Sequence, residues 1–260
     1  MWRDFFDAEY CIYEDTLIFK VVYLNGVTAF SLPLGTCVNE SLKEIESYCN
    51  KQNIPLVFCT ATEEDIAFYK NTYPSIRLTP NEDWNDYLYR AEDLITLSGR
   101  KYSGQRNHMN YFIKNYPNFI FEEIDNQNIM DVKQFYLAAT TGIEKNTNIF
   151  HEEKAKTLEV LDHYGEYCLL GGLLRVDRSI VAFAIGEKIK DTLFVHIERA
   201  DNNYRGASQM IVNLFPKYFA NEDVSFINRE EDVGDEGLRT AKKAYHPIQI
   251  IKKYTVEVGL

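Results

Sequence analysis

A dense run of ionisable residues lies near the C-terminus, in the segment FINREEDVGDEGLRTAKKAY at residues 226–245. An apolar strand end leads into polar residues that include Asn228, Glu230 and Asp232, and a helix is expected over 235–245. Acidic residues crowd the start of that helix and basic residues its end, as the helix dipole prefers. Ionisable groups at a strand–helix junction are a common way to build a binding site in an α/β sheet. The alternative is a well-capped surface helix after a polar loop.

A second group lies on the strand expected over 192–198, where His196 and Glu198 are two residues apart. Strand alternation would place His196, Glu198 and Ala200 on one face. A general base for an attacking amine needs a group near neutral pKa, which histidine or a desolvated glutamate supplies. We therefore predict Glu198 or Glu230 as the catalytic base, with His196 as an orienting partner. The alternative is a buried, hydrogen-bonded pair with a structural role.

Cationic residues supply candidate anion sites. Residues 94–121 contain no acidic residue but include Lys101 and Arg106. Such an island could hold a phosphate, a carboxylate or an RNA end. Alternatively, its cations face the acidic bulk of the protein. Arg199 and Arg239 are further candidates to pair with carboxylates or a donor phosphate, the alternative being internal salt bridges to neighbouring acids.

Composition bounds the class of protein. The chain has 260 residues, of which 45% are hydrophobic, so a sizeable core is expected and wholesale disorder is excluded. The net charge of −11 disfavours bulk attraction to nucleic acid or anionic lipid. Five scattered cysteines without CxxC spacing predict reduced thiols in a cytoplasmic protein. No metal-ligand spacing, signal-peptide pattern or membrane-spanning apolar run is visible.

The first part of the chain has an α/β pattern. Strands are expected over 13–24 and 27–34, joined by a hairpin turn at Asn25–Gly26. Thr62 begins a capping box that opens a helix, and a further helix is expected over 86–97. Helix 103–115 follows, stopped by a proline at position 117.

From residue 118 the order of the expected elements is β-α-α-β-β-β-α-β-α-β, ending in one strand over 248–258. That order is the topology of the GNAT acyltransferase fold. Its fourth strand runs through Arg205, Gly206 and Ala207 into a helix over 207–219. GNAT proteins hold the pyrophosphate of acyl-CoA on a glycine-containing loop at this place, through backbone N–H groups and the helix N-terminus. The alternative is a plain turn before a helix.

Several motifs together resemble the phosphatidylglycerol lysyltransferase C-terminal-domain family, which has two GNAT-like folds in tandem. They are DYLYRAEDLITLSGRKYSGQRNHMNYF, GGLLRVDRSIVAFAIGEKI, HIERA and INREEDVGDEGLRTAKKAYHP. The resemblance covers the chain well from about residue 80 and more loosely before it. Better-understood members move an aminoacyl group from aminoacyl-tRNA to a membrane lipid. Carried over by position, the resemblance implies site residues Arg106, Asn107, His196, Glu198, Arg199, Asn228, Arg229, Glu230, Asp232, Gly234, Gly237, Leu238, Arg239, Lys242 and Tyr245.

We therefore predict an α/β (α+β) protein with mixed central sheets and two tandem GNAT-like domains, residues 1–115 and 116–260, with the site between them. The predicted reaction transfers an acyl or aminoacyl group from a CoA thioester or aminoacyl-tRNA to an amine or hydroxyl acceptor, on a small molecule or peptide, without a tightly bound cofactor or metal. The predicted donor-binding residues are Lys101, Arg106, Asn107, Arg205, Gly206 and Ala207. The predicted substrate-binding residues are Arg199, Asn228, Asp232, Arg239 and Lys242.

Two alternatives remain open. The chain could be a non-catalytic module that binds a small molecule or peptide on the same fold. It could also bind RNA without catalysis, which the net charge of −11 opposes.

Overall fold

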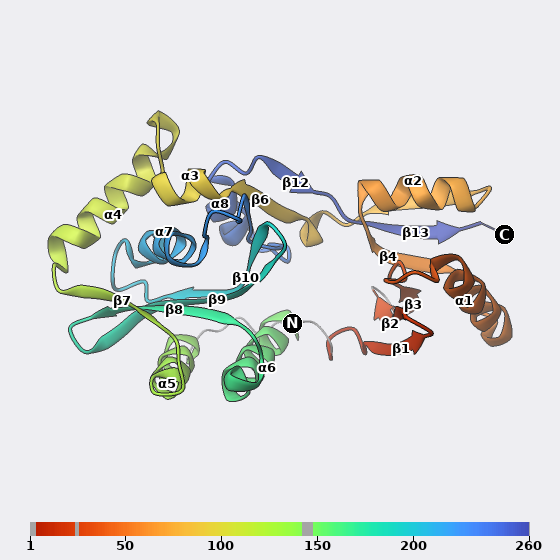
Figure 1. Cartoon of the computed structure of the whole chain (residues 1–260), viewed down its shortest axis with the longest axis horizontal. Coiled ribbons are helices and arrows are strands. Elements are labelled where there is room, and N and C mark those ends of the chain that lie inside the picture. Colours follow the sequence, from red (N-terminus) through yellow and green to blue (C-terminus); the bar gives the residue numbers. More distant parts are fainter. Residues whose placement is uncertain (1–3, 24–25, 142–147, 260) are drawn as a thin grey trace. The chain divides into compact units, whose positions relative to one another are not determined.

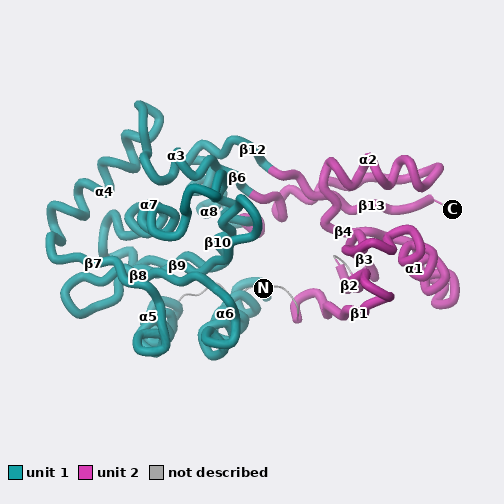
Figure 2. Tube along the Cα trace, in the orientation of Figure 1, with its two compact units in different colours: residues 1, 87–230, 235–250 teal, residues 2–86, 231–234, 251–260 magenta. Residues whose placement is uncertain are grey.

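The computed structural model describes residues 4–23, 26–141 and 148–259. The chain folds into two compact units (Figure 2). Unit 1 contains residues 87–230 and 235–250, and unit 2 contains residues 2–86, 231–234 and 251–260. The sequence predicted two GNAT-like domains, residues 1–115 and 116–260. The compact units do not test whether the chain contains two such folds, so this division stays a prediction.

Unit 2 is built on a six-stranded mixed sheet with the order β1-β2-β3-β4-β13-β5. β3 and β4 run parallel, and the other neighbours are antiparallel. The strands are β1 (Glu9–Tyr13), β2 (Thr16–Tyr23), β3 (Val27–Phe30), β4 (Val57–Ala61), β5 (Ile76–Pro80) and β13 (Tyr254–Val258). The C-terminal strand therefore pairs within the N-terminal sheet. Residue Asn25 of the predicted hairpin turn lies outside the described residues.

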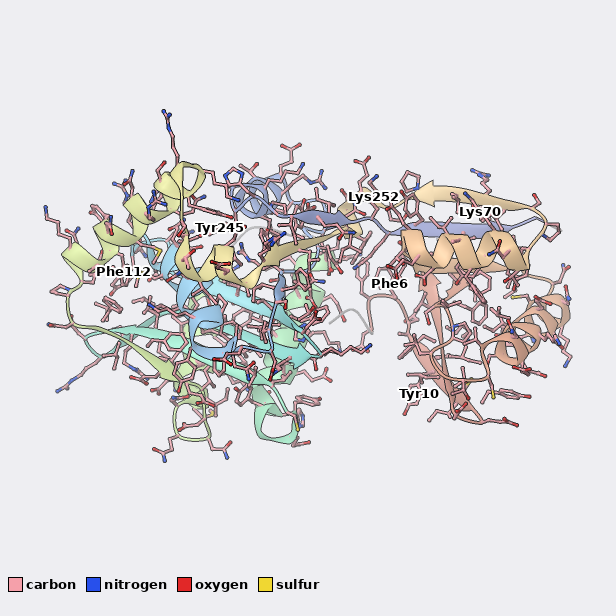
Figure 3. The ribbon with its side chains drawn as sticks, turned by 45° about the horizontal axis from the view of Figure 1, so that its top comes forward. Phe6, Tyr10, Lys70, Phe112, Tyr245 and Lys252 are labelled. Carbon is pink, nitrogen blue, oxygen red and sulfur yellow. The ribbon has the colours of Figure 1, made fainter. Side chains whose placement is uncertain are left out.

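Two helices accompany this sheet, α1 (Val38–Gln52) and α2 (Glu63–Thr72). Leu42, Ile45 and Cys49 are buried at helical spacing, so α1 has one apolar face. The predicted capping box at Thr62 is confirmed, with Asp65 as the reciprocal partner. At the sheet edge, Tyr10 of β1 extends into solvent and is 71% exposed (Figure 3).

Unit 1 is built on a seven-stranded mixed sheet with the order β12-β6-β11-β10-β9-β8-β7. The β10–β11 pair is parallel, whereas the β6–β11, β9–β10, β8–β9 and β7–β8 pairs are antiparallel. The strands are β6 (Asp86–Arg90), β7 (Phe119–Glu123), β8 (Leu170–Val176), β9 (Ser179–Ile189), β10 (Thr192–Ala200), β11 (Phe226–Asn228) and β12 (Gln249–Ile251).

Helices cover both faces of this sheet (Figure 1). They are α3 (Ala91–Thr96), α4 (Ser103–Asn115), α5 (Ile129–Thr140), α6 (Asn148–Asp162), α7 (Ala207–Phe219) and α8 (Glu236–Lys243). One core holds α7 against the sheet, with Met210 and Phe215 among its members. A second core holds α5 and α6 against the opposite face, with Val132 and Leu161 among its members. Short 3₁₀ turns lie at Glu82–Trp84, Arg100–Tyr102 and Tyr164–Glu166.

The predicted element order of the second half is confirmed, and the helices 103–115 and 207–219 have the predicted bounds. The helix predicted over 86–97 is wrong in its first five residues, which form β6. Tyr87 and Tyr89 are buried while their neighbours are partly exposed, and this two-residue alternation allows β6 to pair with β11. The strand predicted over 248–258 is two strands, β12 and β13, which belong to different sheets.

Among the helices that the structure describes, none combines the length and the hydrophobicity needed to cross a membrane.

Candidate active site

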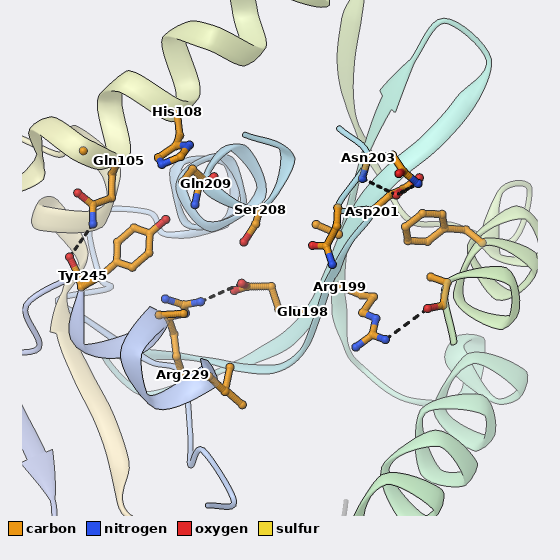
Figure 4. A pocket seen from close by; sticks show the side chains of 18 of the residues that line it. Gln105, His108, Glu198, Arg199, Asp201, Asn203, Ser208, Gln209, Arg229 and Tyr245 are labelled. Carbon is orange, nitrogen blue, oxygen red and sulfur yellow. Dashed lines mark hydrogen bonds and ion pairs between the residues drawn. The ribbon is translucent and has the colours of Figure 1, made fainter. Parts of the chain in front are cut away.

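A cavity of about 910 Å³ lies within unit 1 (Figure 4). Its wall combines α4, the end of α5, the end of β10, the start of α7, and the segment from β11 through α8. Its volume falls in the range of pockets that hold small-molecule ligands. Each of the three ionisable stretches singled out in the sequence contributes to this wall, although not always through the predicted side chain.

A β-bulge in β10 decides which side chains of that strand reach the cavity. Leu193 and Val195 pack in the α7 core, but Ile197 packs in the opposite α5–α6 core. The pairing with β9 shifts by one residue between Val195 and Ile197, so His196 is the extra residue. Because the bulge reverses the alternation, Glu198 faces the cavity. The expectation that one regular alternation runs from His196 through Glu198 is therefore wrong.

Glu198 forms an ion pair with Arg229, whose Nη2 donates to Glu198 Oε1 at 2.8 Å. Arg229 is only 7% exposed, and its guanidinium lies 5.1 Å from the centre of the Tyr245 ring. Burial alone would lower the pKa of Arg229, but the charge and hydrogen bond of Glu198 outweigh it and raise the pKa. A buried charge of this kind persists only when it is paired, so the two side chains define a fixed, ionised part of the wall.

The backbone around Arg229 is held by buried polar contacts. Lys242 Nζ donates to the carbonyl oxygens of Arg229 at 2.5 Å and Glu230 at 3.1 Å. Asn228 Oδ1 accepts from the Glu230 N–H at 2.8 Å. Glu230 itself has a φ of 53°, a left-handed conformation that a non-glycine residue adopts only when its surroundings enforce it. The predicted residues Asn228 and Lys242 thus position Arg229 and do not line the cavity.

His196 and Glu230 form a separate cluster with Glu187. His196 Nδ1 lies 2.7 Å from Glu230 Oε1, and Nε2 lies 3.1 Å from Glu187 Oε1. Burial lowers the pKa of His196, but the two carboxylates outweigh it, and the net pKa is raised. None of the three side chains lines the cavity. The predicted partnership of His196 with a glutamate exists, but in this cluster and away from Glu198.

The cationic island contributes through other residues than those predicted. Arg106 Nη1 donates to the carbonyl oxygens of Leu97 and Gly99, and Lys101 pairs with Asp93 at 3.5 Å. Neither cation lines the cavity, and Asn107 does not line it either. Gln105 and His108 of α4 line it instead. Their spacing of three residues on a helix was a signal that could have found them.

The start of α7 presents Ser208 and Gln209 to the cavity. Their backbone N–H groups have no acceptor among the described residues, as is usual for the first turn of a helix. Gly206 has a φ of +95° and packs against α4, because an added β-carbon would lie 2.4 Å from the His108 carbonyl oxygen. Arg205 lies over the Tyr111 ring at 4.5 Å, and neither Arg205 nor Ala207 lines the cavity.

Arg199 lines the cavity and donates to the Ala139 carbonyl oxygen at 3.4 Å. Within the described ranges it has no carboxylate partner. Asp232 is fully buried and accepts from the Gly234 N–H at 3.0 Å, and neither Asp232 nor Arg239 lines the cavity. In the described part of the chain, no three His, Cys, Asp or Glu side chains gather as a metal site would need. All five cysteines are free thiols.

The element order and the two mixed sheets define a GNAT-like α/β fold, as the sequence predicted. The chain matches the family model for phosphatidylglycerol lysyltransferase, C-terminal, over residues 1–257. It therefore belongs to that family, and the match includes the first 80 residues, where the motifs resembled the family only loosely.

The chain is also similar to three known proteins. An uncharacterised protein of Mycoplasmoides gallisepticum is 27% identical over 181 residues, which cover 68% of this chain and 58% of that protein. The chain thus spans less than two thirds of that relative's length. The structure of a conserved Bacteroides thetaiotaomicron protein of unknown function has a TM-score of 0.90 and a sequence identity of 29%. The match covers 99% of this chain and 88% of the Bacteroides chain. The structure of L-PGS from Bacillus licheniformis has a TM-score of 0.68 and a sequence identity of 15%. That match covers 96% of this chain and 84% of the Bacillus chain.

Proposed function

We propose that the cavity of unit 1 is the site of an acyl- or aminoacyltransferase, and family membership supports this class. The observation that carries the proposal is the Glu198 carboxylate. It lies in the cavity wall, is held by a buried arginine, and shares the cavity with the first turn of α7. A carboxylate, an anion-binding helix end and a cavity of suitable volume are what such a transfer needs.

Glu198 acts as the general base in this proposal. Its Oε1 accepts from Arg229, and its Oε2 has no partner among the described residues. Oε2 takes the proton from an amine or hydroxyl acceptor as that group attacks the donor carbonyl carbon. The new C–N or C–O bond forms, the donor C–O or C–S bond breaks, and the proton passes to the leaving oxygen or sulfur. The protein then returns to its starting state.

The donor is a substrate that carries phosphate, either an acyl-CoA or an aminoacyl-tRNA. The free N–H groups of Ser208 and Gln209 support phosphate binding at the α7 N-terminus. Arg199 supports an anionic group on a ligand, since no carboxylate neutralises it within the described ranges. The acceptor is a small molecule or a peptide, and a lipid head group is a further candidate because of the family's name.

A thermal-shift screen followed by a transfer assay tests the proposal. The screen offers acyl-CoAs, charged and uncharged tRNA, free amino acids and phosphatidylglycerol, because a ligand of the native state raises the melting temperature. We expect one phosphate-bearing donor to stabilise the protein, and its labelled acyl group to reach an amine or hydroxyl acceptor. A donor that binds outside the cavity, or a complete set that produces no shift, would contradict the proposal.

The second candidate is a binding module without catalysis. Gly206 and Arg205 favour it, because both pack against α4 where a GNAT loop would hold pyrophosphate. In that case a ligand of the screen would stabilise wild-type and Glu198→Gln proteins equally, and neither protein would transfer a label.

A further inference from the structure

Two hydrogen-bond donors in the cavity wall have no acceptor within the part of the chain that the structure describes. They are Nη1 of Arg229 and the hydroxyl of Tyr245, on residues that are 7% and 5% exposed. The nearby buried tyrosines differ from them. Tyr89 donates to the Lys242 carbonyl oxygen at 2.9 Å, and Tyr102 donates to the Tyr245 carbonyl oxygen at 3.1 Å. The hydroxyls of Tyr23, Tyr69 and Tyr73 in unit 2 also lack an acceptor among the described residues, so what distinguishes Arg229 and Tyr245 is that they line the cavity.

Such donors are costly without a ligand. A buried donor that lacks an acceptor destabilises a protein by about 1–3 kcal/mol. The Tyr89 and Tyr245 rings near the Arg229 guanidinium attract its charge, but such a contact with a ring is not a hydrogen bond to Nη1. Figure 4 shows the Tyr245 hydroxyl directed toward the middle of the cavity, beside the Arg229–Glu198 pair. Both atoms are nearly inaccessible to solvent, although their side chains line the cavity.

We propose that Arg229 and Tyr245 form a subsite for an oxygen that carries negative charge. Within the transfer reaction proposed above, on which this inference rests, that oxygen is the carbonyl oxygen of the migrating acyl group. It gains negative charge when the acceptor attacks. Donors that the protein already holds in place stabilise such charge, because little reorganisation is needed during the reaction.

The Glu198–Arg229 pair makes this subsite dependent on the proton transfer. In the resting protein, the Glu198 carboxylate balances the positive charge of Arg229. When Glu198 takes the proton of the acceptor, it becomes neutral, and the charge of Arg229 is no longer balanced. At the same step the carbonyl oxygen becomes negative and takes the place of Glu198 as the counter-charge. When the leaving group departs with that proton, the carbonyl and the ion pair are restored.

The first test measures stability. Tyr245→Phe removes a buried hydroxyl that has no acceptor, so we expect an unchanged or raised melting temperature. The matched variant Tyr164→Phe removes a buried hydroxyl that donates to the Leu169 carbonyl oxygen at 3.3 Å, and we expect a lowered melting temperature. Equal losses in the two variants would show that the Tyr245 hydroxyl has a partner within the protein, and would overturn the subsite.

The second test measures binding of methylphosphonate, a tetrahedral anion, by calorimetry on the full chain. Glu198→Gln is neutral and keeps an acceptor for Arg229, so it imitates the protonated state. We expect it to bind methylphosphonate about tenfold more tightly than the wild type does. Adding Tyr245→Phe should weaken that binding about fivefold to tenfold, and adding Tyr164→Phe should leave it unchanged.

The results separate the subsite from the proposed function. Tighter binding by Glu198→Gln that depends on Tyr245 supports the subsite, whether or not the wild type transfers any label. Binding that Glu198→Gln does not strengthen, or that Tyr245→Phe does not weaken, overturns the subsite even if transfer is observed. An absence of transfer rejects only the reaction.

Discussion

Two groups of ionisable side chains lie close together on unit 1 but in different surroundings. The cavity pair, Glu198 and Arg229, lines a large cavity and includes a nearly buried guanidinium. The bulge cluster, His196 with Glu187 and Glu230, lies outside the cavity lining, and its histidine side chain is 21% exposed. The comparison teaches that neighbouring residues of one strand and one turn can have different surroundings, and we propose a binding role only for the pair that lines the cavity.

The largest expected effect concerns stability. Arg229→Met leaves Glu198, whose side chain is only 20% exposed, without its cation, and we expect the free energy of unfolding to fall by about 3 kcal/mol. The matched variant Arg77→Met breaks an exposed ion pair with Glu257, 3.6 Å long, and should cost less than about 1 kcal/mol. Denaturant unfolding measures both. Similar losses would mean that the cavity pair is as well solvated as the surface pair.

The next effect concerns turnover. Once a donor is found, Glu198→Gln should lower the rate of transfer about 100-fold or more, because the base is lost. Glu230→Gln should change the rate only a few-fold, since Glu230 bonds His196 outside the cavity. A large loss in Glu230→Gln with none in Glu198→Gln would move the base to the bulge cluster.

A smaller effect tests the wall that α4 and α7 share. Gly206→Ala places a β-carbon 2.4 Å from the His108 carbonyl oxygen at a φ of +95°, and should destabilise the protein by about 1–3 kcal/mol. The control is Gly104→Ala on α4, where a β-carbon meets nothing within 4 Å and alanine favours the helix. It should leave stability unchanged or raise it. Chemical denaturation of the two variants would contradict this packing if the losses were equal.

The smallest effect is a pH dependence of the bulge cluster. Because the pKa of His196 is raised in the folded protein, its contribution to stability is complete below the unfolded value of about 6.5 and is lost as pH rises through the folded value. The stability difference between wild type and His196→Gln should therefore be larger at pH 6 than at pH 8.5. His163→Gln, at an exposed pair with Glu166, should show a weaker dependence. A difference that grows with pH would contradict the raised pKa.

Much of the fold could be predicted from the sequence, because local signals and the fold agree there. The helix over 103–115, the capping box at Thr62 and the element order of the second half are examples. The β6 strand was missed because the residues after Asp86 fit both a helical and an alternating pattern. Only pairing with β11, far away in sequence, decides between them. The division of 248–258 between two sheets also depends on long-range pairing.

The site could be predicted by segment but not by side chain. Glu198 and Arg199 were expected at a site, and both line the cavity. Arg106 and Lys101 were also expected there, but Arg106 donates to nearby carbonyl oxygens and Lys101 pairs with Asp93. The bulge at His196 cannot be read from the residue types around it, although it determines where Glu198 points. Backbone irregularities of this kind follow from tertiary packing, which sequence periodicity does not report.

The most direct test of the account is a crystal structure of the protein with the ligand that gives the largest thermal shift. We predict that the ligand occupies the cavity of unit 1, with its phosphate at the N–H groups of Ser208 and Gln209 and its acyl group beside Glu198 and Arg229. A ligand bound elsewhere, with this cavity filled only by solvent, would contradict the central claim.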